Sequence, residues 1–352
     1  MPRMSDILKK IKASQDFSLP ELNKVSDNAA ENNARENINT EISEKAAAES
    51  EKEPSACTYS FASPLDAYNT LISCAAGIFD YKKTSVDPFL DGKHLMALFR
   101  DFLSVFPGYK DDLLKLAYQN NTAHDNYLIA HAVNSTVYSI ALTAELEMSG
   151  TQSAEIAVSI FLHDIGMKEY LSLVNQPVSM AKAEYETLKY HTTRAEYYLR
   201  QIPDLPELAY HVAKSHHERQ DGTGYPEGLK KNKLHSVVKL AAFCDVYAAL
   251  VQPRAYRDKF NSVKALDILL QQKDRFSRKV IRAFIQEIGV YPPGAKVELN
   301  TGEYATVINV RTHTPMRPVI VISSGDAGVD PVRERVMDLA DHSAIYIRDI
   351  VA

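Results

Sequence analysis

The segment HHERQDGTGYPEG spans residues 216–228 and joins two adjacent histidines to a turn rich in glycine and proline. The turn alone is an ordinary loop signal, because Gly, Pro and Asp are common in turns. It becomes informative because it begins four residues after the histidine pair, at Asp221. Apolar residues at helical spacing precede it, over 205–217 behind an Asp204 cap, and follow it over 237–248. The segment therefore predicts a functional loop between two helices.

Further His and Asp side chains lie in or near apolar helical stretches on both sides of this segment. A carboxylate in such a helix costs several kcal/mol unless it is paired or bound to a metal. A lone buried histidine is usually a hydrogen-bonded core residue, but one shared cation site explains the whole set together. Neutral imidazoles with carboxylates favour iron, manganese or zinc over magnesium. The residues are His131, His163, Asp164, His191 and Asp245.

The motifs around these residues resemble those of the HD-GYP branch of the HD phosphohydrolase superfamily. The resemblance covers about residues 123–290 and is most specific in the run 216–226. It implies a helical fold and a cyclic di-GMP phosphodiesterase with two divalent metal ions, most often iron or manganese. The other matching motifs are HDIG at 163–166, KYH at 189–191, FCDVYAAL at 243–250 and PRAYR at 253–257.

The resemblance also implies a role for each matching side chain. One metal is expected on His131, His163, Asp164 and Asp245, and a second on Asp164, His191, His216 and His217. Asp164 is expected to bridge the two metals, and the catalytic residues are Asp164 and Lys168. The residues expected to contact substrate are Gly222, Gly224, Tyr225, Pro226, Arg254 and Arg257.

Two positions depart from the family pattern. The family usually has a lysine after the glycine of His-Asp-x-Gly, where it contacts the scissile phosphate; here Met167 takes that position and Lys168 follows. Members with a third metal carry a glutamate where this chain has Tyr127, so two metals are expected. Met167 keeps a second hypothesis open, a catalytically weakened sensor of cyclic di-GMP or a signalling scaffold. A phosphohydrolase for a different nucleotide is a third, which the Gly-Tyr-Pro loop disfavours.

The predicted fold class is mainly α, with a helical HD-type phosphohydrolase core at 123–290. Residues 1–60 have too few apolar side chains to form a core and predict a disordered tail. Residues 5–14 have amphipathic spacing that fits a short helix docking on a partner or a membrane surface, but a fraying turn is the favoured alternative. Residues 61–122 have helical spacing and predict a small helical region. In residues 291–352 the spacing of apolar residues changes from the helical period to the alternating period of strands. This region therefore predicts a small β appendage with hairpin strands near 297–299 and 305–310.

Composition narrows the class of protein further. Sixteen Pro and 13 Gly among 352 residues are ordinary for a folded chain. The net charge of −5 gives no basic footprint, so duplex nucleic acid is not an expected partner. The three cysteines form no Cys-x-x-Cys pattern, and the sequence shows neither a secretory signal nor a stretch apolar enough to span a membrane. These features predict a cytoplasmic protein without a transmembrane segment. The resemblance adds cyclic di-GMP as substrate or ligand, and a homodimer or diguanylate-cyclase-type signalling proteins as partners.

Overall fold

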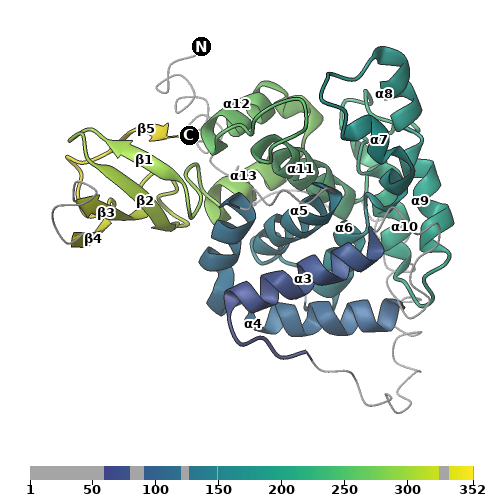
Figure 1. Ribbon diagram of the computed structural model, residues 1–352, viewed down its shortest axis with the longest axis horizontal. Helices are drawn as coiled ribbons and strands as arrows, with labels where there is room; N and C mark the ends of the chain where they lie inside the picture. The colour runs from purple at the N-terminus through teal and green to yellow at the C-terminus, as the bar shows by residue number, and fades with distance from the viewer. Residues whose placement is uncertain (1–58, 80–90, 120–126, 149, 325–332, 352) are drawn as a thin grey trace, which may run out of the picture.

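The computed structural model describes residues 59–79, 91–119, 127–148, 150–324 and 333–351. A helical body makes up most of the described chain, and a C-terminal sheet lies to one side of it (Figure 1). The predicted fold class, mainly α with a small β part at the C-terminus, is confirmed. The tail predicted at 1–60, with its short helix, lies outside the described residues except for the last two.

The helical body contains α-helices joined by short 3-10 turns. The α-helices are α3 (Pro64–Ile78), α4 (Gly92–Gln119), α5 (Tyr127–Thr143), α6 (Gly150–Phe161), α7 (Leu171–Val174), α8 (Lys182–Leu188), α9 (His191–Leu199), α10 (Glu207–Ser215), α11 (Ser236–Val251), α12 (Ser262–Gln271) and α13 (Arg278–Glu287). The 3-10 turns are η1 (Ile165–Tyr170), η2 (Lys231–Lys233) and η3 (Lys273–Arg275).

Helix α5 runs through the middle of the helical body and is buried from its second residue to its last. It contacts α11, α6, α4 and α3, which surround it in Figure 1. Both α5 and α11 are apolar on most of their circumference, as expected for helices enclosed by others. His131 of α5 and Asp245 of α11 are therefore held in the interior. Within the described part of the chain, no helix combines the length and the apolar composition needed to cross a lipid bilayer.

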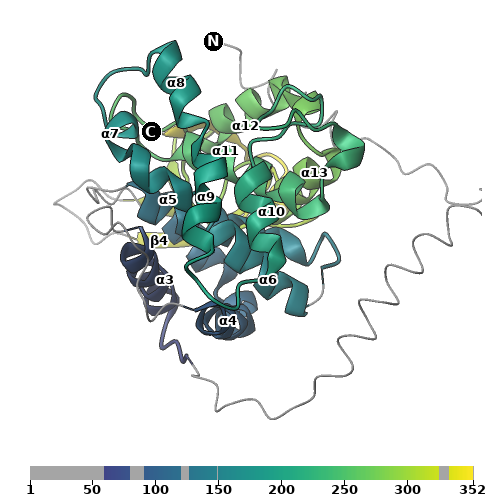
Figure 2. The same ribbon diagram turned by 90° about the vertical axis from the view of Figure 1, so that its right-hand side faces the viewer.

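Helices α9 and α10 pack against each other, and Figure 2 shows them side by side. Turn η1 packs on α9, and α10 packs on α6. Helix α10 begins at Glu207 with Pro206 as its N-cap residue, two positions later than the Asp204 cap predicted from sequence. Pro206 has an extended ψ of 138°, so it precedes the first turn instead of lying inside it. The helix then delivers residues 216–217 at its C-terminal end.

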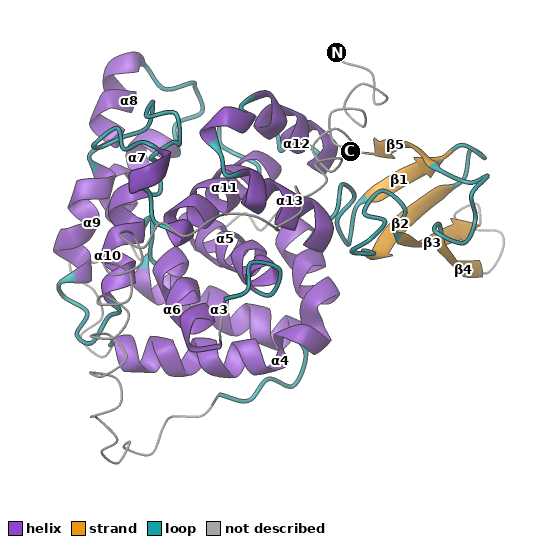
Figure 3. Cartoon of the chain, turned by 180° about the vertical axis from the view of Figure 1, so that it is seen from behind, coloured by secondary structure: helices purple, strands orange, loops and turns teal. Residues whose placement is uncertain are grey.

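The C-terminal sheet has five antiparallel strands in the order β4-β3-β2-β1-β5. The predicted hairpin is present as β1 and β2, with Val297 opposite Ala305. Gln119, at the end of α4, donates to the carbonyl of Gly294 at 2.9 Å and so ties the sheet to the body. Figure 3 shows the sheet on the side away from α7 to α10. The strands are β1 (Lys296–Leu299), β2 (Tyr304–Asn309), β3 (Val319–Ser324), β4 (Arg333–Asp338) and β5 (Ile347–Val351).

One continuous hydrophobic core joins α3, the central helices and the inner face of the sheet. The helical body and the sheet are thus packed together. The division of the chain at residues 60, 122 and 290 stays a prediction.

Candidate metal centre

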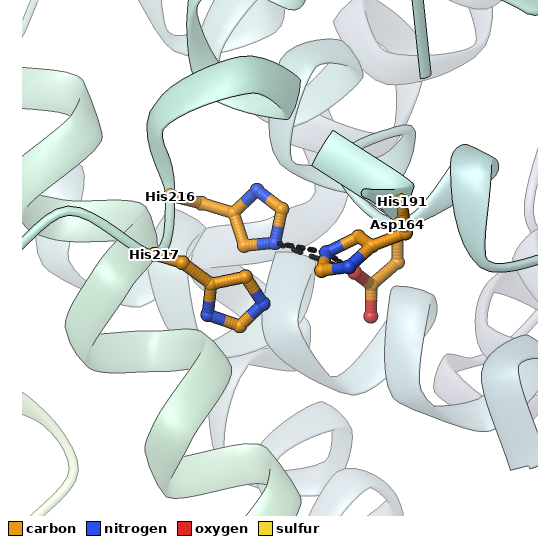
Figure 4. Close-up of side chains that lie close together, drawn as sticks. All are labelled: Asp164, His191, His216 and His217. Atoms are coloured by element: carbon orange, nitrogen blue, oxygen red, sulfur yellow. Dashed lines mark hydrogen bonds and ion pairs between the residues drawn. The ribbon is translucent and has the colours of Figure 1, made fainter. Parts of the chain in front are cut away.

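Two groups of histidine and aspartate side chains meet inside the helical body and share Asp164. In each group, the atoms able to bind a metal lie within 4.8 Å of one another. Figure 4 shows the group that includes the histidine pair, whose side chains converge from different elements. The structure thus brings together all seven side chains that the sequence analysis selected. The groups are His131, His163, Asp164 and Asp245, and Asp164, His191, His216 and His217.

Helix ends supply most of these side chains. Residues 163–164 lie in the turn between α6 and η1, His191 is the first residue of α9, and residues 216–217 directly follow α10. His131 and Asp245 lie inside the buried helices α5 and α11. Ligand groups from distant parts of the sequence therefore meet because the helices that carry them pack against one another.

Gly166 allows η1 to approach α9 closely. A Cβ atom at this position meets the carbonyl oxygen of His191 at 2.0 Å and the amide nitrogen of Ala195 at 2.7 Å, both of them backbone atoms. No side chain fits there unless the two elements separate. The glycine of the His-Asp-x-Gly motif therefore sets the separation between Asp164 and His191.

Backbone carbonyls fix three of the imidazole rings. In His163, His191 and His216, Nδ1 lies 2.5, 2.7 and 3.0 Å from the carbonyl oxygen of the residue three positions earlier. A carbonyl oxygen only accepts hydrogen bonds, so Nδ1 carries the proton in each ring and donates it. Each Nε2 is then left with a lone pair directed into the cluster, which is the arrangement typical of metal-ligating histidines.

Asp164 lies between the two groups and offers one oxygen to each. Its Oδ1 is 3.3 Å from Nε2 of His216 and 3.5 Å from Nε2 of His191. Its Oδ2 is 3.5 Å from Nε2 of His163 and 3.7 Å from Nε2 of His131. A carboxylate in this position suits a ligand shared by two cations.

The donor atoms of the cluster fit a cation. Nε2 of His163 and Oδ1 of Asp164 are buried and have no hydrogen-bond partner. A buried polar atom without a partner costs about 1–3 kcal/mol. Nε2 of a neutral His163 and Oδ1 of Asp164 each have a lone pair, and they belong to different ligand groups. One divalent cation in each group supplies the missing partners.

Charges inside the cluster shift the pKa values of its members. Burial raises the pKa of Asp164, but the surrounding imidazoles, His163 first, outweigh burial and hold the pKa well below its usual value. Burial lowers the pKa of His163, and the carboxylates of Asp164 and Asp245 outweigh this and raise the pKa to about 9. Burial lowers the pKa of His191 to about 4. The ion-free cluster therefore holds charged carboxylates and a proton on His163, with which a cation competes.

Gln252 is a member of the site that the sequence analysis missed. Its Oε1 lies 3.1 Å from Nδ1 of His131, whose Nε2 lies 3.1 Å from Oδ1 of Asp245. The amide oxygen accepts the Nδ1 proton and so fixes the ring as the carbonyls fix the other three. A signal was present in its position, since it follows Asp245 by seven residues, which is about two helical turns.

The Gly-Tyr-Pro loop folds back onto the histidine pair. A Cβ atom at Gly224 meets the amide nitrogen of Arg219 at 2.4 Å, so only glycine fits. Tyr225 donates its backbone N–H to the carbonyl of His217, and its ring stacks on the imidazole of His217 with centroids 4.7 Å apart. Gly222, with a φ of +80°, begins the turn, and Pro226 is exposed. The predicted loop therefore lies beside the second ligand group.

Glu218 anchors the far side of this loop, a role that the sequence analysis did not assign. Its side chain is buried, with the residue 1% exposed. Oε1 accepts from the backbone N–H groups of Glu227 and Gly228 at 2.7 and 3.1 Å, and Oε2 accepts from Leu229 at 2.9 Å. The residue between the metal-site histidines and the loop thus ties them together.

Arg254 lies at the edge of the first ligand group. Its guanidinium carbon is 3.9 Å from the ring centroid of Tyr127, and that ring is 6.2 Å from the imidazole of His131. Tyr127 occupies the position of the glutamate found in members with a third metal, and here it packs against Arg254.

Two other cationic side chains for which the sequence analysis expects roles at the site contact helix C-termini. Lys168 is buried, and its Nζ donates to the carbonyl of Ile78, the last residue of α3, at 2.8 Å. Arg257 donates to the carbonyl of Ala249 near the end of α11 at 2.7 Å, and to the carbonyl of Asp258 at 2.9 Å. The last carbonyls of a helix lack partners within the helix and attract cations. Lys168 thus stabilises the end of α3 and Arg257 the end of α11, and their catalytic and substrate-binding roles stay predictions.

The ligand groups open to solvent beside His217. Its side chain is 18% exposed, compared with 9% for Asp245, 6% for Asp164 and at most 1% for His131, His163, His191 and His216. A reactant therefore reaches the cluster from the side of His217 and Asp245.

Comparison with known proteins shows an HD domain in this chain. A family model described as an HD domain matches residues 115–280. A cyclic di-GMP phosphodiesterase of Pseudomonas aeruginosa is 30% identical over 216 residues, which cover 61% of this chain and 52% of that protein. The HD-domain match includes the motifs at 163–166 and 216–226. The chain contains an HD domain, and the comparisons support its resemblance to the HD-GYP family. A second model, a KOW domain associated with the HD domain, matches residues 296–352 of the chain.

Two further comparisons agree with this resemblance. A cyclic di-GMP phosphodiesterase of Borreliella burgdorferi is 26% identical over 204 residues, covering 57% of this chain and 54% of that protein. The solved structure of an HDG"Y"P protein from Bdellovibrio bacteriovorus matches with a TM-score of 0.51 and 14% identity, over 73% of this chain and 79% of that one, which supports the fold. The chain spans about half the length of these two curated relatives. HD domains bind divalent metal ions, and both ligand groups lie within the HD domain.

Proposed function

We propose that this HD-domain protein is a metal-dependent phosphodiesterase that hydrolyses cyclic di-GMP to the linear dinucleotide pGpG, with a second cleavage to GMP left as an open alternative for the end product. The observation that carries the proposal is the pair of four-residue ligand groups joined through Asp164. Relatives from two bacteria are cyclic di-GMP phosphodiesterases, which supports the substrate class.

The proposed cofactor is a pair of divalent ions, iron or manganese, one for each ligand group. Imidazole and carboxylate donors suit these metals better than magnesium. Divalent ions in such a pair polarise phosphoryl oxygens and lower the pKa of bound water. Asp164 serves both ions, and His163, His191 and His216 are held by their backbone partners with Nε2 directed inward.

The chain's own residues bind and orient the substrate in this proposal. Arg254, held over Tyr127, presents a planar fork to a phosphate or a guanine. The loop residues Gly222, Gly224, Tyr225 and Pro226 line the substrate at the open side, beside His217. Because the other ligands are buried, the scissile phosphate is separated from bulk water on the opposite side.

The decisive experiment combines metal analysis with turnover. Protein purified without oxygen is loaded with iron, manganese or zinc, its metal content is measured by mass spectrometry, and products of cyclic di-GMP are separated by chromatography. We expect about two ions per chain and release of pGpG. Asp164→Asn is expected to lower metal content and abolish hydrolysis, while the exposed control Asp274→Asn retains both. Absence of bound metal together with absence of hydrolysis under every supplement refutes the proposal.

A second function, sensing of cyclic di-GMP or scaffolding, is favoured by one observation. Met167 takes the position of the family's phosphate-contacting lysine, and the ammonium of Lys168 is bound by the carbonyl of Ile78. The same assay separates the two functions. Tight binding of cyclic di-GMP without product formation in metal-loaded protein selects the sensor.

The remaining expectations about surroundings stay predictions. These are a homodimer, contacts with diguanylate-cyclase-type signalling proteins, a cytoplasmic location and the absence of duplex nucleic acid as a partner. Light scattering of the purified chain tests the homodimer, and binding assays with a purified cyclase test the second contact.

A further inference from the structure

The open side of the metal centre is lined by two cation–aromatic arrangements. Arg254 lies over the ring of Tyr127, next to His131. On the other side, Lys189 lies between two tyrosine rings, one of which stacks on His217. The first arrangement includes a residue that the family pattern already assigns to substrate. The second arrangement includes two side chains, Tyr185 and Lys189, that belong to neither ligand group. Lys189 begins the KYH motif, but no role was assigned to it there.

The second arrangement is compact and accessible. The ammonium of Lys189 is 5.2 Å from the ring centroid of Tyr185 and 5.5 Å from that of Tyr225. The ring of Tyr225 is itself 4.7 Å from the imidazole of His217. The ammonium is thus one aromatic ring removed from the ligand cluster, at its most exposed member. Tyr185 is 46% exposed, so its ring has a face available to a ligand.

Glu186 holds Lys189 in this position. The carboxylate of Glu186 accepts from Nζ at 2.8 and 2.9 Å. An ammonium carries three donors, so this pairing leaves Lys189 able to donate to a ligand. An exposed ion pair of this kind is weak and does not prevent such a contact.

We infer that Tyr185, Lys189 and Tyr225 form a guanine-binding shelf, on which one base of the cyclic dinucleotide stacks. The inference rests on the proposed function and adds the residues that select the base. The exposed ring of Tyr185 supplies a flat surface for a purine, and Tyr225, stacked on His217, forms the inner wall beside Lys189. Lys189 donates to the acceptors O6 and N7 of guanine. Adenine presents an amino donor where guanine presents O6, so Lys189 disfavours adenine. The shelf therefore determines both the affinity for a purine and the preference for guanine.

The shelf is tested with variants that leave the metal ligands in place. Tyr185→Ala removes the stacking ring, Lys189→Met removes the charge and keeps the length of the side chain, and Tyr197→Ala is a control at an exposed tyrosine of α9 outside the shelf. Each protein, loaded with metal, is assayed with cyclic di-GMP, cyclic di-AMP and bis(p-nitrophenyl) phosphate, a diester without a base. Equilibrium binding of the two cyclic dinucleotides is measured in parallel.

Three results support the shelf together. Tyr185→Ala raises the KM or the dissociation constant for cyclic di-GMP roughly 5- to 150-fold, the range of a lost base–aromatic stack, while kcat stays within about twofold. Lys189→Met lowers the ratio of guanine to adenine affinity by about tenfold or more, as expected for a lost base-edge contact. Hydrolysis of bis(p-nitrophenyl) phosphate and metal content match the wild type and Tyr197→Ala.

Other results overturn the shelf, and they are distinguishable from failure of the proposed function. Equal losses with all three substrates mean that the variants damage the centre, and unchanged affinity with all of them means that the base binds elsewhere. If the wild type binds cyclic di-GMP without hydrolysing it, the phosphodiesterase proposal fails, and the binding measurements still decide the shelf. If the wild type binds neither dinucleotide, the shelf is refuted.

Discussion

Replacing Glu218 by glutamine tests how the Gly-Tyr-Pro loop is held against the metal site. The carboxylate accepts three backbone N–H groups, from Glu227, Gly228 and Leu229. Glutamine keeps an oxygen for the first two donors but presents an NH2 group to Leu229. One buried donor therefore loses its acceptor, and the other two lose the charge of theirs.

The size of the effect follows from these contacts. A hydrogen bond to a charged group contributes about 1.5–3 kcal/mol. Loss of the bond at Leu229 is thus expected to lower the local opening free energy by about 2 kcal/mol, which corresponds to roughly 30-fold faster amide exchange. Proteins of this kind have about 5–15 kcal/mol of stability, so the fold survives the change.

Hydrogen exchange read by mass spectrometry over peptides containing residues 225–231 measures the effect. The matched control is Glu227→Gln in the same loop, where an exposed ion pair with Lys214 is lost at a cost of at most about 1 kcal/mol. We also expect a higher KM for cyclic di-GMP in Glu218→Gln, because Tyr225 is no longer held on His217. Wild-type exchange at Leu229 in the glutamine variant refutes the anchoring role of the carboxylate.

Three further predictions concern the metal and the two arginines. Gly166→Ala places a Cβ 2.0 Å from the carbonyl of His191, so η1 and α9 separate and metal analysis is expected to show loss of at least one ion per chain. Arg257→Ala is expected to lower Tm by about 2–4 °C for the loss of about 1 kcal/mol at the end of α11, whereas Arg254→Ala raises KM and leaves Tm unchanged; the reverse pattern contradicts both assignments. The pKa of His163 is raised from 6.5 to about 9 in the ion-free fold, so this proton stabilises the fold fully below pH 6.5, and the stabilisation is lost as pH rises through 9. Metal binding displaces this proton, so calorimetry at about pH 7.5 in buffers of different ionisation enthalpy is expected to show proton release. A metal affinity that does not change with pH between about 6.5 and 8.5 contradicts the assignment of His163 as a ligand.

The residues of the two ligand groups could be predicted from the sequence for a physical reason. Histidines and aspartates inside apolar helices have few stable environments other than a shared cation site, so their residue types and surroundings were informative. The family motifs then assigned them to two groups with Asp164 in common, and the structure places the same side chains within reach of one another. The sequence analysis did not predict Gln252 as part of the site, because an uncharged amide at a helix end has many ordinary roles.

The long cationic side chains were less predictable. Lys168 and Arg257 have several rotatable bonds, and a sequence pattern does not say whether such a chain extends toward the centre or toward a nearby helix end. Here the carbonyls of Ile78 and Ala249 compete successfully for both charges. The role of Glu218 was also not predictable from the sequence. Its partners are backbone N–H groups about ten positions away, and every residue type except proline has such a group.

Charge balance connects the proposed ions with the proposed substrate. The ligand groups contain two carboxylates and otherwise neutral imidazoles, so two divalent ions leave the filled centre with a net positive charge. A cyclic dinucleotide carries one negative charge on each of its two phosphodiesters, and the open side adds Arg254 and Lys189 near the two edges of the cluster. Positive potential in a buried site is weakly screened by water and salt. A centre of this charge favours an anionic diester over a neutral ligand even without a lysine at position 167, so the proposed function does not depend on a lysine there.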